Sequence, residues 1–88
     1  MNKIYTITTE GCESCYRLEK LINAALGLTK KEVEVVFEDV KSVDKNWLKR
    51  NNVTDFPTTF LIKDNSIKFK FIGTRPAIII ARWIDVRL

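Results

Sequence analysis

Cys12 and Cys15 are the only cysteines of the 88 residues, and they lie three positions apart where one structural pattern gives way to another. Before them, β-branched and aromatic residues over positions 4–9 predict a β-strand. After them, apolar residues recur at spacings of three and four, which predicts an amphipathic helix that begins at Glu13 and stops at Gly27. A thiol pair at the junction of a strand and a helix constrains the fold more than any other feature of this chain.

The middle of the chain predicts a second strand and a short helix. Valines and a phenylalanine over positions 33–37 favour the strand. A strand, a helix and a strand in that order indicate a right-handed βαβ unit with parallel strands. Ser42 offers an N-cap for the short helix, which carries Trp47 on its inner side and ends near Asn51.

A β-hairpin is predicted over positions 58–71. Residues 60–62 are apolar strand formers, and the pair 64–65 supplies the turn. Over 67–71, apolar residues alternate with lysines, which is the period of a half-buried strand. This alternation predicts that the three apolar side chains of the second strand share one face.

The end of the chain predicts a last helix. Gly73 ends the hairpin, and Thr74 is the predicted cap, with Pro76 in the first turn. The inner face would consist of three residues, Ile80, Trp83 and Ile84. The run 78–80 also fits a strand. The predicted order is therefore β-α-β-α-β-β-α, in one domain that spans residues 1–88.

The formal charge of +4 comes from basic residues spread along the whole chain. Such a distribution is typical of a solvated surface and disfavours a nucleic-acid patch, although it suits an acidic protein partner. No stretch reaches the roughly 18 apolar residues that a membrane span needs. Residues 1–9 lack the apolar core of a signal peptide. We therefore expect a cytoplasmic protein, and a permanent structural disulfide is uncommon in that compartment.

The C-x-x-C pair beside a βαβ pattern is typical of a redox motif. At the start of a helix, Cys12 would face free N–H groups and the positive end of the dipole, which together lower a thiol pKa from about 8.5. Cys15, one turn deeper, would be less exposed and would attack a mixed disulfide at Cys12. Glu13 opposes the thiolate, whereas Arg17 and Lys20 partly offset it, so we expect a moderate lowering and a reductant.

Other interpretations of the two cysteines remain open at this point. They could be two buried cysteines with no chemical role. Structural zinc normally needs four ligands, and the chain has two cysteines and no histidine. A metal or cluster shared between two chains is a third alternative, and it predicts a coloured dimer.

A proline precedes the predicted hairpin, because Pro57 is followed by Thr58, and Gly73 closes the hairpin. Together with the C-x-x-C that opens the first helix, this pattern resembles the thioredoxin/glutaredoxin superfamily over nearly the whole chain. The resemblance implies an α/β, thioredoxin-like fold of glutaredoxin size, with a four-stranded mixed sheet flanked by three helices. It also implies a cis peptide bond between Phe56 and Pro57 beside the sulfurs, where the Phe56 backbone could pair with an extended substrate strand.

The same resemblance implies a function. The chain would be a thiol–disulfide oxidoreductase that reduces protein or small-molecule disulfides, with Cys12 as the nucleophile and Cys15 as the resolving cysteine. A thioredoxin reductase or glutathione would supply the electrons, and the protein would act as a monomer without a cofactor or metal. The substrate would contact eight residues around the thiols: Gly11, Glu13, Ser14, Tyr16, Phe56, Pro57, Gly73 and Thr74.

The sequence departs from the pattern of thioredoxins. Glu13 and Ser14 stand between the cysteines in place of Gly-Pro, and Gly11 stands where thioredoxins have tryptophan. Thr6 occupies the position of their buried acid. Proton transfer to the second thiol would then depend on another group, such as Glu10 or Glu13, or on water. Small redoxins that supply ribonucleotide reductase mix features in this way, which makes that enzyme a candidate electron acceptor.

The sequence also departs from glutaredoxins. They hold glutathione through Thr-Val before the cis-proline and a Gly-Gly-x-Asp-like stretch after the last strand. Here the corresponding residues are Asp55-Phe56 and the run 73–75, so glutathione binding is in doubt. Arg75 could recognise a carboxylate of glutathione or of a partner, or it could simply be solvated.

A second class of function is a binding module with incidental thiols. The thioredoxin-like surface around Gly11, Phe56 and Gly73 would then dock onto a larger protein as a structural subunit. Replacement of Cys12 by Ser separates the two classes, because it abolishes disulfide reduction but leaves docking intact.

Overall fold

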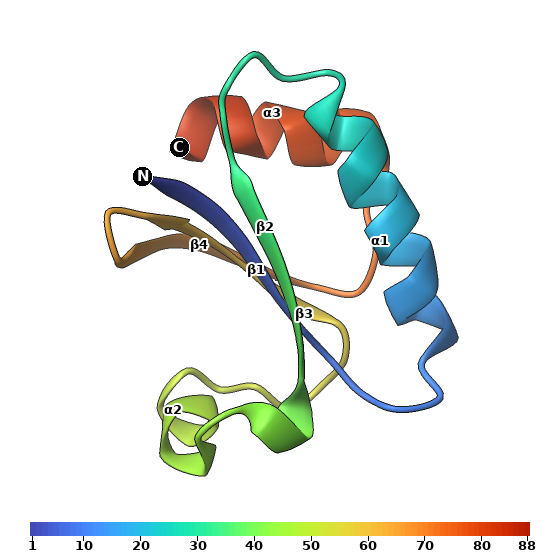
Figure 1. Ribbon diagram of the computed structural model, residues 1–88, viewed down its shortest axis with the longest axis vertical. Coiled ribbons are helices and arrows are strands. Elements are labelled where there is room, and N and C mark those ends of the chain that lie inside the picture. The colour runs from blue at the N-terminus through green and yellow to red at the C-terminus, as the bar shows by residue number, and fades with distance from the viewer.

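The computed structural model describes all residues, 1–88, and its elements follow the predicted order β-α-β-α-β-β-α (Figure 1). A single 3₁₀ turn, Val40–Ser42, follows the second strand. No helix combines the length and the apolar character that crossing a bilayer requires. The strands and α-helices are β1 (Asn2–Thr8), α1 (Glu13–Leu26), β2 (Glu34–Asp39), α2 (Lys45–Arg50), β3 (Thr58–Lys63), β4 (Ser66–Ile72) and α3 (Ala77–Arg87).

The four strands form one mixed sheet in the order β2-β1-β3-β4. β1 and β2 are parallel, as the βαβ pattern predicted, and β3 is antiparallel to both β1 and β4. Ile7, near the end of β1, lies opposite Thr58 at the start of β3. The segment that leaves β1 and the segment that enters β3 therefore meet at the same end of the sheet.

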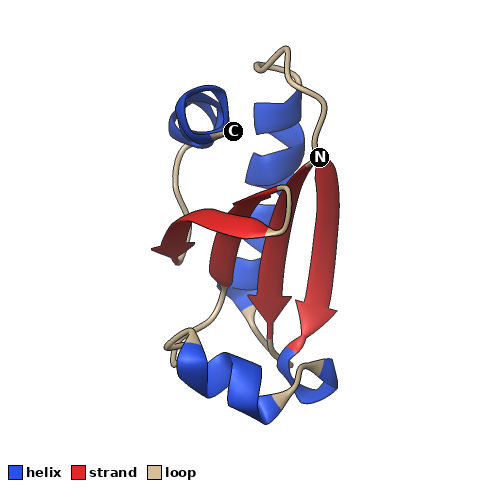
Figure 2. Cartoon of the chain, turned by 90° about the vertical axis from the view of Figure 1, so that its left-hand side faces the viewer, coloured by secondary structure: helices blue, strands red, loops and turns tan.

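The main core lies between one face of the sheet and the helices α1 and α3, which contact each other. Fully burying an apolar side chain of this size contributes about 1.5–3 kcal/mol. The short helix α2 lies at one end of the sheet (Figure 2). Its Trp47 packs edge-on against Tyr5 and Phe60, with ring centroids 5.8 and 5.2 Å apart. The main core consists of ten buried residues: Ile4, Leu18, Ile22, Ala25, Leu61, Phe71, Ile80, Ala81, Ile84 and Leu88.

The predicted cap of α2 at Ser42 is wrong. Asp44 caps this helix, and its side chain accepts a hydrogen bond from the Asn46 N–H at 3.1 Å. Ser42 belongs to the 3₁₀ turn instead, because Asp39 already accepts from the Lys41 N–H at 2.8 Å and starts that turn. Ser42 and Asp44 are capping residues of similar strength. Because Asp39 starts a 3₁₀ turn that includes Ser42, α2 begins only after Asp44.

The predicted cap of α3 at Thr74 is also wrong. The helix begins at Ala77, and Pro76 occupies the N-cap position without a side-chain hydrogen bond. Proline suits the start of a helix because its fixed φ is compatible and it has no N–H to satisfy. The run 78–80 is helical, so the alternative strand is excluded.

The alternation over 67–71 is interrupted by a β-bulge. Leu61 pairs with Phe69, but the next residue, Ile62, pairs with Ile67, which leaves Lys68 as the extra residue. Because side chains alternate with a period of two, the bulge moves Ile67 to the face opposite Phe69. Ile67 is 41% exposed, contrary to the prediction that it joins the core face.

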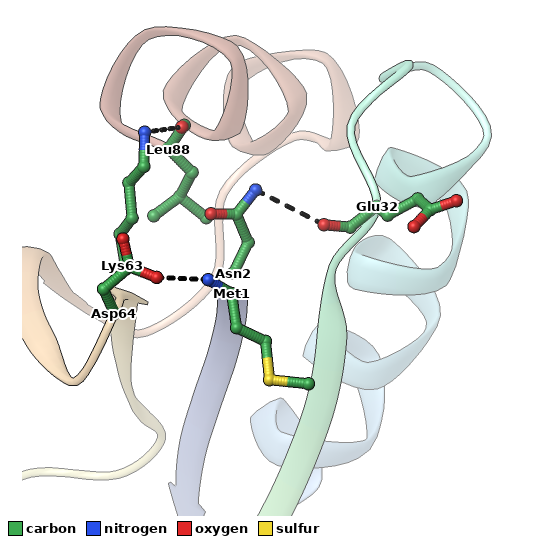
Figure 3. Close-up of polar contacts among 6 residues, drawn as sticks. All are labelled: Met1, Asn2, Glu32, Lys63, Asp64 and Leu88. Carbon is green, nitrogen blue, oxygen red and sulfur yellow. Dashed lines mark hydrogen bonds and ion pairs between the residues drawn. The ribbon is translucent and has the colours of Figure 1, made fainter.

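Both chain ends are bound beside the hairpin turn (Figure 3). The amino group of Met1 donates a hydrogen bond to the carboxylate of Asp64. This hydrogen bond is the main reason that the pKa of Asp64 is below its usual value. Lys63 Nζ donates to the Leu88 carbonyl at 3.0 Å. The turn thus joins the first strand to the end of the last helix.

Candidate active site

Cys12 and Cys15 form a disulfide at the N-terminus of α1, with their Cα atoms 5.2 Å apart. Cys12 is the N-cap residue in extended conformation, and Glu13 is the first helical residue, as the sequence predicted. Cys15 is only 6% exposed, whereas Cys12 is partly exposed. Cys12 is therefore the more accessible of the two to a disulfide on another molecule.

Two donors lie within hydrogen-bonding distance of Cys12 Sγ. The backbone N–H of Cys15 donates at 3.1 Å, and Ser14 Oγ is 3.4 Å away. In the reduced protein both can stabilise a thiolate, in addition to the helix dipole. Sequence analysis gave Ser14 only a substrate contact, although a hydroxyl two positions after a helix cap is a signal that could have revealed this second role.

The loop between β1 and α1 depends on Gly11. Its φ of +67° lies in the left-handed region, which a residue with a side chain adopts at a cost of about 1–2 kcal/mol. A Cβ built at Gly11 meets no atom within 4 Å, so space would allow a side chain there. Backbone conformation, not crowding, therefore accounts for a glycine where thioredoxins have tryptophan.

The loop before β3 carries the predicted proline. The Phe56–Pro57 peptide bond is cis, and Pro57 is buried while Phe56 is half-buried. The hydroxyl of Thr58 donates to the Asp55 carbonyl, which closes the bend. The Pro57 carbonyl accepts from the Gly73 N–H at 2.8 Å, so this loop is tied to the one that follows β4.

Three loops therefore gather at one end of the sheet (Figure 1). The register of β1 and β3 brings the cysteine loop and the Pro57 loop to that end. The bond from Gly73 adds the third loop. Among the other predicted site residues, Glu13 and Tyr16 are exposed on α1 and Thr74 is half-buried beside Gly73.

A pocket of about 260 Å³ lies on the β2 side of the disulfide. This pocket was not predicted, because its residues from β2 are far from the cysteines along the chain. Glu10, at its rim, forms an exposed ion pair with Lys41 at 3.3 Å. No group of three or more side chains is arranged to hold a metal ion. The lining residues are Thr8, Thr9, Glu10, Cys15, Tyr16, Glu19, Phe37 and Asp39.

Thr6 stands where thioredoxins have a buried acid, and the structure shows how the position is filled. The side chain is completely buried, and its hydroxyl shares a hydrogen bond of 2.9 Å with that of Thr59, which is equally buried. The pair is satisfied without any titratable group. A proton that leaves or reaches Cys15 must therefore use another route.

No family model matches this sequence, and no curated protein sequence matches it. Solved structures of thioredoxins do match. Thioredoxin-2 of a malaria parasite superposes with a TM-score of 0.81 at 12% identity, over 98% of this chain and 82% of that one. The chain has the thioredoxin fold.

Two flatworm thioredoxins superpose almost as well. The protein of Schistosoma mansoni gives a TM-score of 0.78 at 16% identity, over 99% of this chain and 79% of that one. The protein of Fasciola hepatica gives 0.77 at 21% identity, with 99% and 81% covered. The resemblance inferred from sequence is thus confirmed for the fold, and the chain is a thioredoxin-fold protein with a C-x-x-C pair at the start of α1.

Proposed function

We propose that this protein is a thiol–disulfide oxidoreductase that reduces disulfides of proteins or small molecules. One observation supports the proposal most strongly: Cys12 and Cys15 are already paired at the start of α1, with Cys12 accessible and Cys15 buried. An accessible thiolate can attack a disulfide on another molecule, whereas a buried thiol next to it can attack only the mixed disulfide that forms there, so the two cysteines differ in the way that a two-step exchange requires.

The proposed reaction consists of two thiol–disulfide exchanges. In the first, the Cys12 thiolate attacks one sulfur of the substrate disulfide, which forms a mixed disulfide and releases the other substrate sulfur as a thiolate. In the second, Cys15 loses its proton and attacks the Cys12 sulfur, which releases the remaining substrate thiolate. The substrate gains two electrons and leaves as two thiolates, and the Cys12–Cys15 disulfide forms. The thiolates take up two protons from solvent, which replace those that Cys12 and Cys15 gave up.

Residues around the thiols support these steps physically. The Cys15 N–H and the Ser14 hydroxyl are positioned to stabilise the Cys12 thiolate. The backbone of Phe56, in the loop that enters β3, is a candidate to pair with an extended substrate segment. The absence of an acid at Thr6 leaves water, Glu10 or Glu13 as proton acceptors for Cys15 under this proposal.

The partners belong to the proposal as well. A thioredoxin reductase or glutathione would return two electrons to the disulfide, and ribonucleotide reductase is a candidate acceptor of them. Reduction of the oxidised protein by each reductant in turn, measured side by side, identifies the upstream partner.

The proposal predicts that the dithiol protein reduces insulin disulfides with a dithiol reagent as the electron source. Cys12→Ser should lower the rate to that of the reagent alone, because no other thiol of the chain is accessible. Asn23→Ala, at an exposed position further along α1, is a control outside the predicted substrate contacts and should retain most activity. An inert wild-type protein would contradict the proposal and favour the binding module.

A further inference from the structure

β4 is an edge strand of the sheet, and α3 lies near it (Figure 2). Residues of β4 and α3 line a groove between the two elements. Its volume is about 450 Å³. Because β4 ends the sheet, the backbone groups on its outer edge have no partner strand. The groove is lined by Phe69, Lys70, Phe71, Ile72, Arg75 and Trp83.

The floor of this groove is aromatic and well packed. The ring of Trp83 lies 4.7 Å from that of Phe69 and 5.1 Å from that of Phe71, centroid to centroid. Phe71 is buried, while Phe69 and Trp83 are half-buried and present part of their surface to the groove. The floor can therefore accept an apolar side chain without rearrangement.

Two arginines lie over the rings of this floor, of which Arg75 lines the groove and Arg87 lies outside its lining. The guanidinium of Arg75 is 5.9 Å from the Phe71 ring and 6.0 Å from the Trp83 ring, and that of Arg87 is 4.8 Å from the Phe69 ring. Arg75 is held through Nη1, which donates to the carbonyls of Ile72 and Thr74 at 3.0 and 2.7 Å. Its Nη2 and Nε stay free to donate, and together they suit the two oxygens of a carboxylate.

No acidic side chain lines the groove. The acid nearest along α3, Asp85, is engaged elsewhere, because it accepts from the Thr29 hydroxyl and its carbonyl accepts from Lys31 Nζ. Neither arginine takes part in an ion pair within the chain. The charge of the groove is therefore uncompensated and positive, and it is complementary to an acidic ligand.

One end of the groove lies beside the Pro57 loop. Ile72, at the end of β4, pairs with Thr58, and Gly73 donates to the Pro57 carbonyl. A chain that crosses Pro57 reaches the groove beside Arg75 within a few residues, since an extended chain spans about 3.3 Å per residue.

We propose that this groove binds an acidic segment of the disulfide-containing protein. A carboxylate of the segment binds Arg75, and a neighbouring apolar side chain lies on the floor formed by Phe69 and Trp83. The inference rests on the proposed oxidoreductase activity and adds the class of substrate. A charged residue on an edge strand can have the sole function of preventing association between sheets. That explains Lys68, but it does not explain an arginine held over aromatic rings.

Two peptide disulfides test the proposal. The glutamate peptide carries glutamates near its cysteine, and the glutamine peptide is identical except that glutamines replace them. We expect kcat/KM to be about three- to fivefold higher for the glutamate peptide at low salt, and the preference to vanish at high salt. Arg75→Gln should abolish the preference while the rate on the glutamine peptide stays unchanged. Arg82→Gln is the matched control, because Arg82 lines a separate pocket on the other side of α3. This variant loses the same charge and should retain the preference for the glutamate peptide.

A second readout needs no redox chemistry. A linear glutamate peptide without cysteine, titrated into the oxidised protein, should shift the NMR signals of the Trp83 indole and of residues 69–75, and Arg75→Gln should weaken this binding. Equal rates on the two peptides, or equal losses in Arg75→Gln and Arg82→Gln, would overturn the proposal. If both peptides are reduced equally well, the oxidoreductase activity stands and only the acidic specificity fails.

Discussion

At the scale of single residues, two neighbours act on Cys12 in opposite directions. The hydroxyl of Ser14, 3.4 Å from the sulfur, can donate to a thiolate, whereas Glu13 brings a negative charge into the same turn. The sequence predicted the effect of Glu13, because charge and position along a helix suffice for that argument. The position of Ser14 two residues after the cap allows a contact with Cys12, but whether the hydroxyl makes it depends on the rotamer of the side chain.

We predict that Ser14→Ala raises the pKa of the Cys12 thiol and that Glu13→Gln lowers it. Loss of one donor to a charged sulfur at this long distance should reduce the thiolate fraction at neutral pH by about threefold. The rate of alkylation of the reduced protein as a function of pH measures both changes. A Ser14→Ala profile that coincides with that of the wild type would mean that the hydroxyl donates elsewhere.

At the scale of elements, the order of strands and helices was predictable, and so was the start of α1, but the starts of α2 and α3 were not. Apolar residues that recur with a period of two predict a strand, and those with a period of about 3.6 predict a helix. Each prediction uses several residues, so one residue that breaks the period does not change it. A cap depends on one residue, and at α2 both Ser42 and Asp44 qualified. The bulge at Lys68 was hidden for a similar reason, because its sequence alternates without interruption.

The pairing of β1 with β2 includes a titratable contact that a pH experiment can test. Tyr5 on β1 donates to Glu38 on β2, and burial, with this hydrogen bond and the negative charge of Glu38, raises the pKa of Tyr5 above its ordinary value. A raised pKa of an acid means that the neutral form is favoured in the folded state. Its contribution to stability is therefore complete below the unfolded pKa of about 10 and is lost as the pH rises above it.

We predict that the urea midpoint of the wild type falls more steeply than that of Tyr5→Phe between pH 9 and pH 11. The variant retains the ring that packs on Trp47 and loses only the ionisable hydroxyl. Lysines that titrate in the same range affect both proteins equally, so the difference between the two curves isolates Tyr5. Parallel curves would contradict the raised pKa.

At the scale of the whole molecule, the sheet brings three distant loops to the thiol pair. The resemblance in sequence identified all three, through Cys12, Pro57 and Gly73. The pocket next to Cys15 and the groove beside Arg75 were not predictable, because their residues come from elements whose distance in space depends on the register of the sheet. The fold could be inferred without close relatives, since its evidence is distributed over all elements.

The most direct test of the account is to trap the intermediate of the first exchange. In Cys15→Ser the second exchange cannot occur, so incubation of the reduced variant with a peptide disulfide should leave one peptide bound covalently to Cys12. Intact mass spectrometry with peptide mapping should find this adduct in Cys15→Ser and none in Cys12→Ser. No adduct in Cys15→Ser, or an equal adduct on Cys15 when Cys12 is replaced, would contradict the assignment of Cys12 as the attacking thiol.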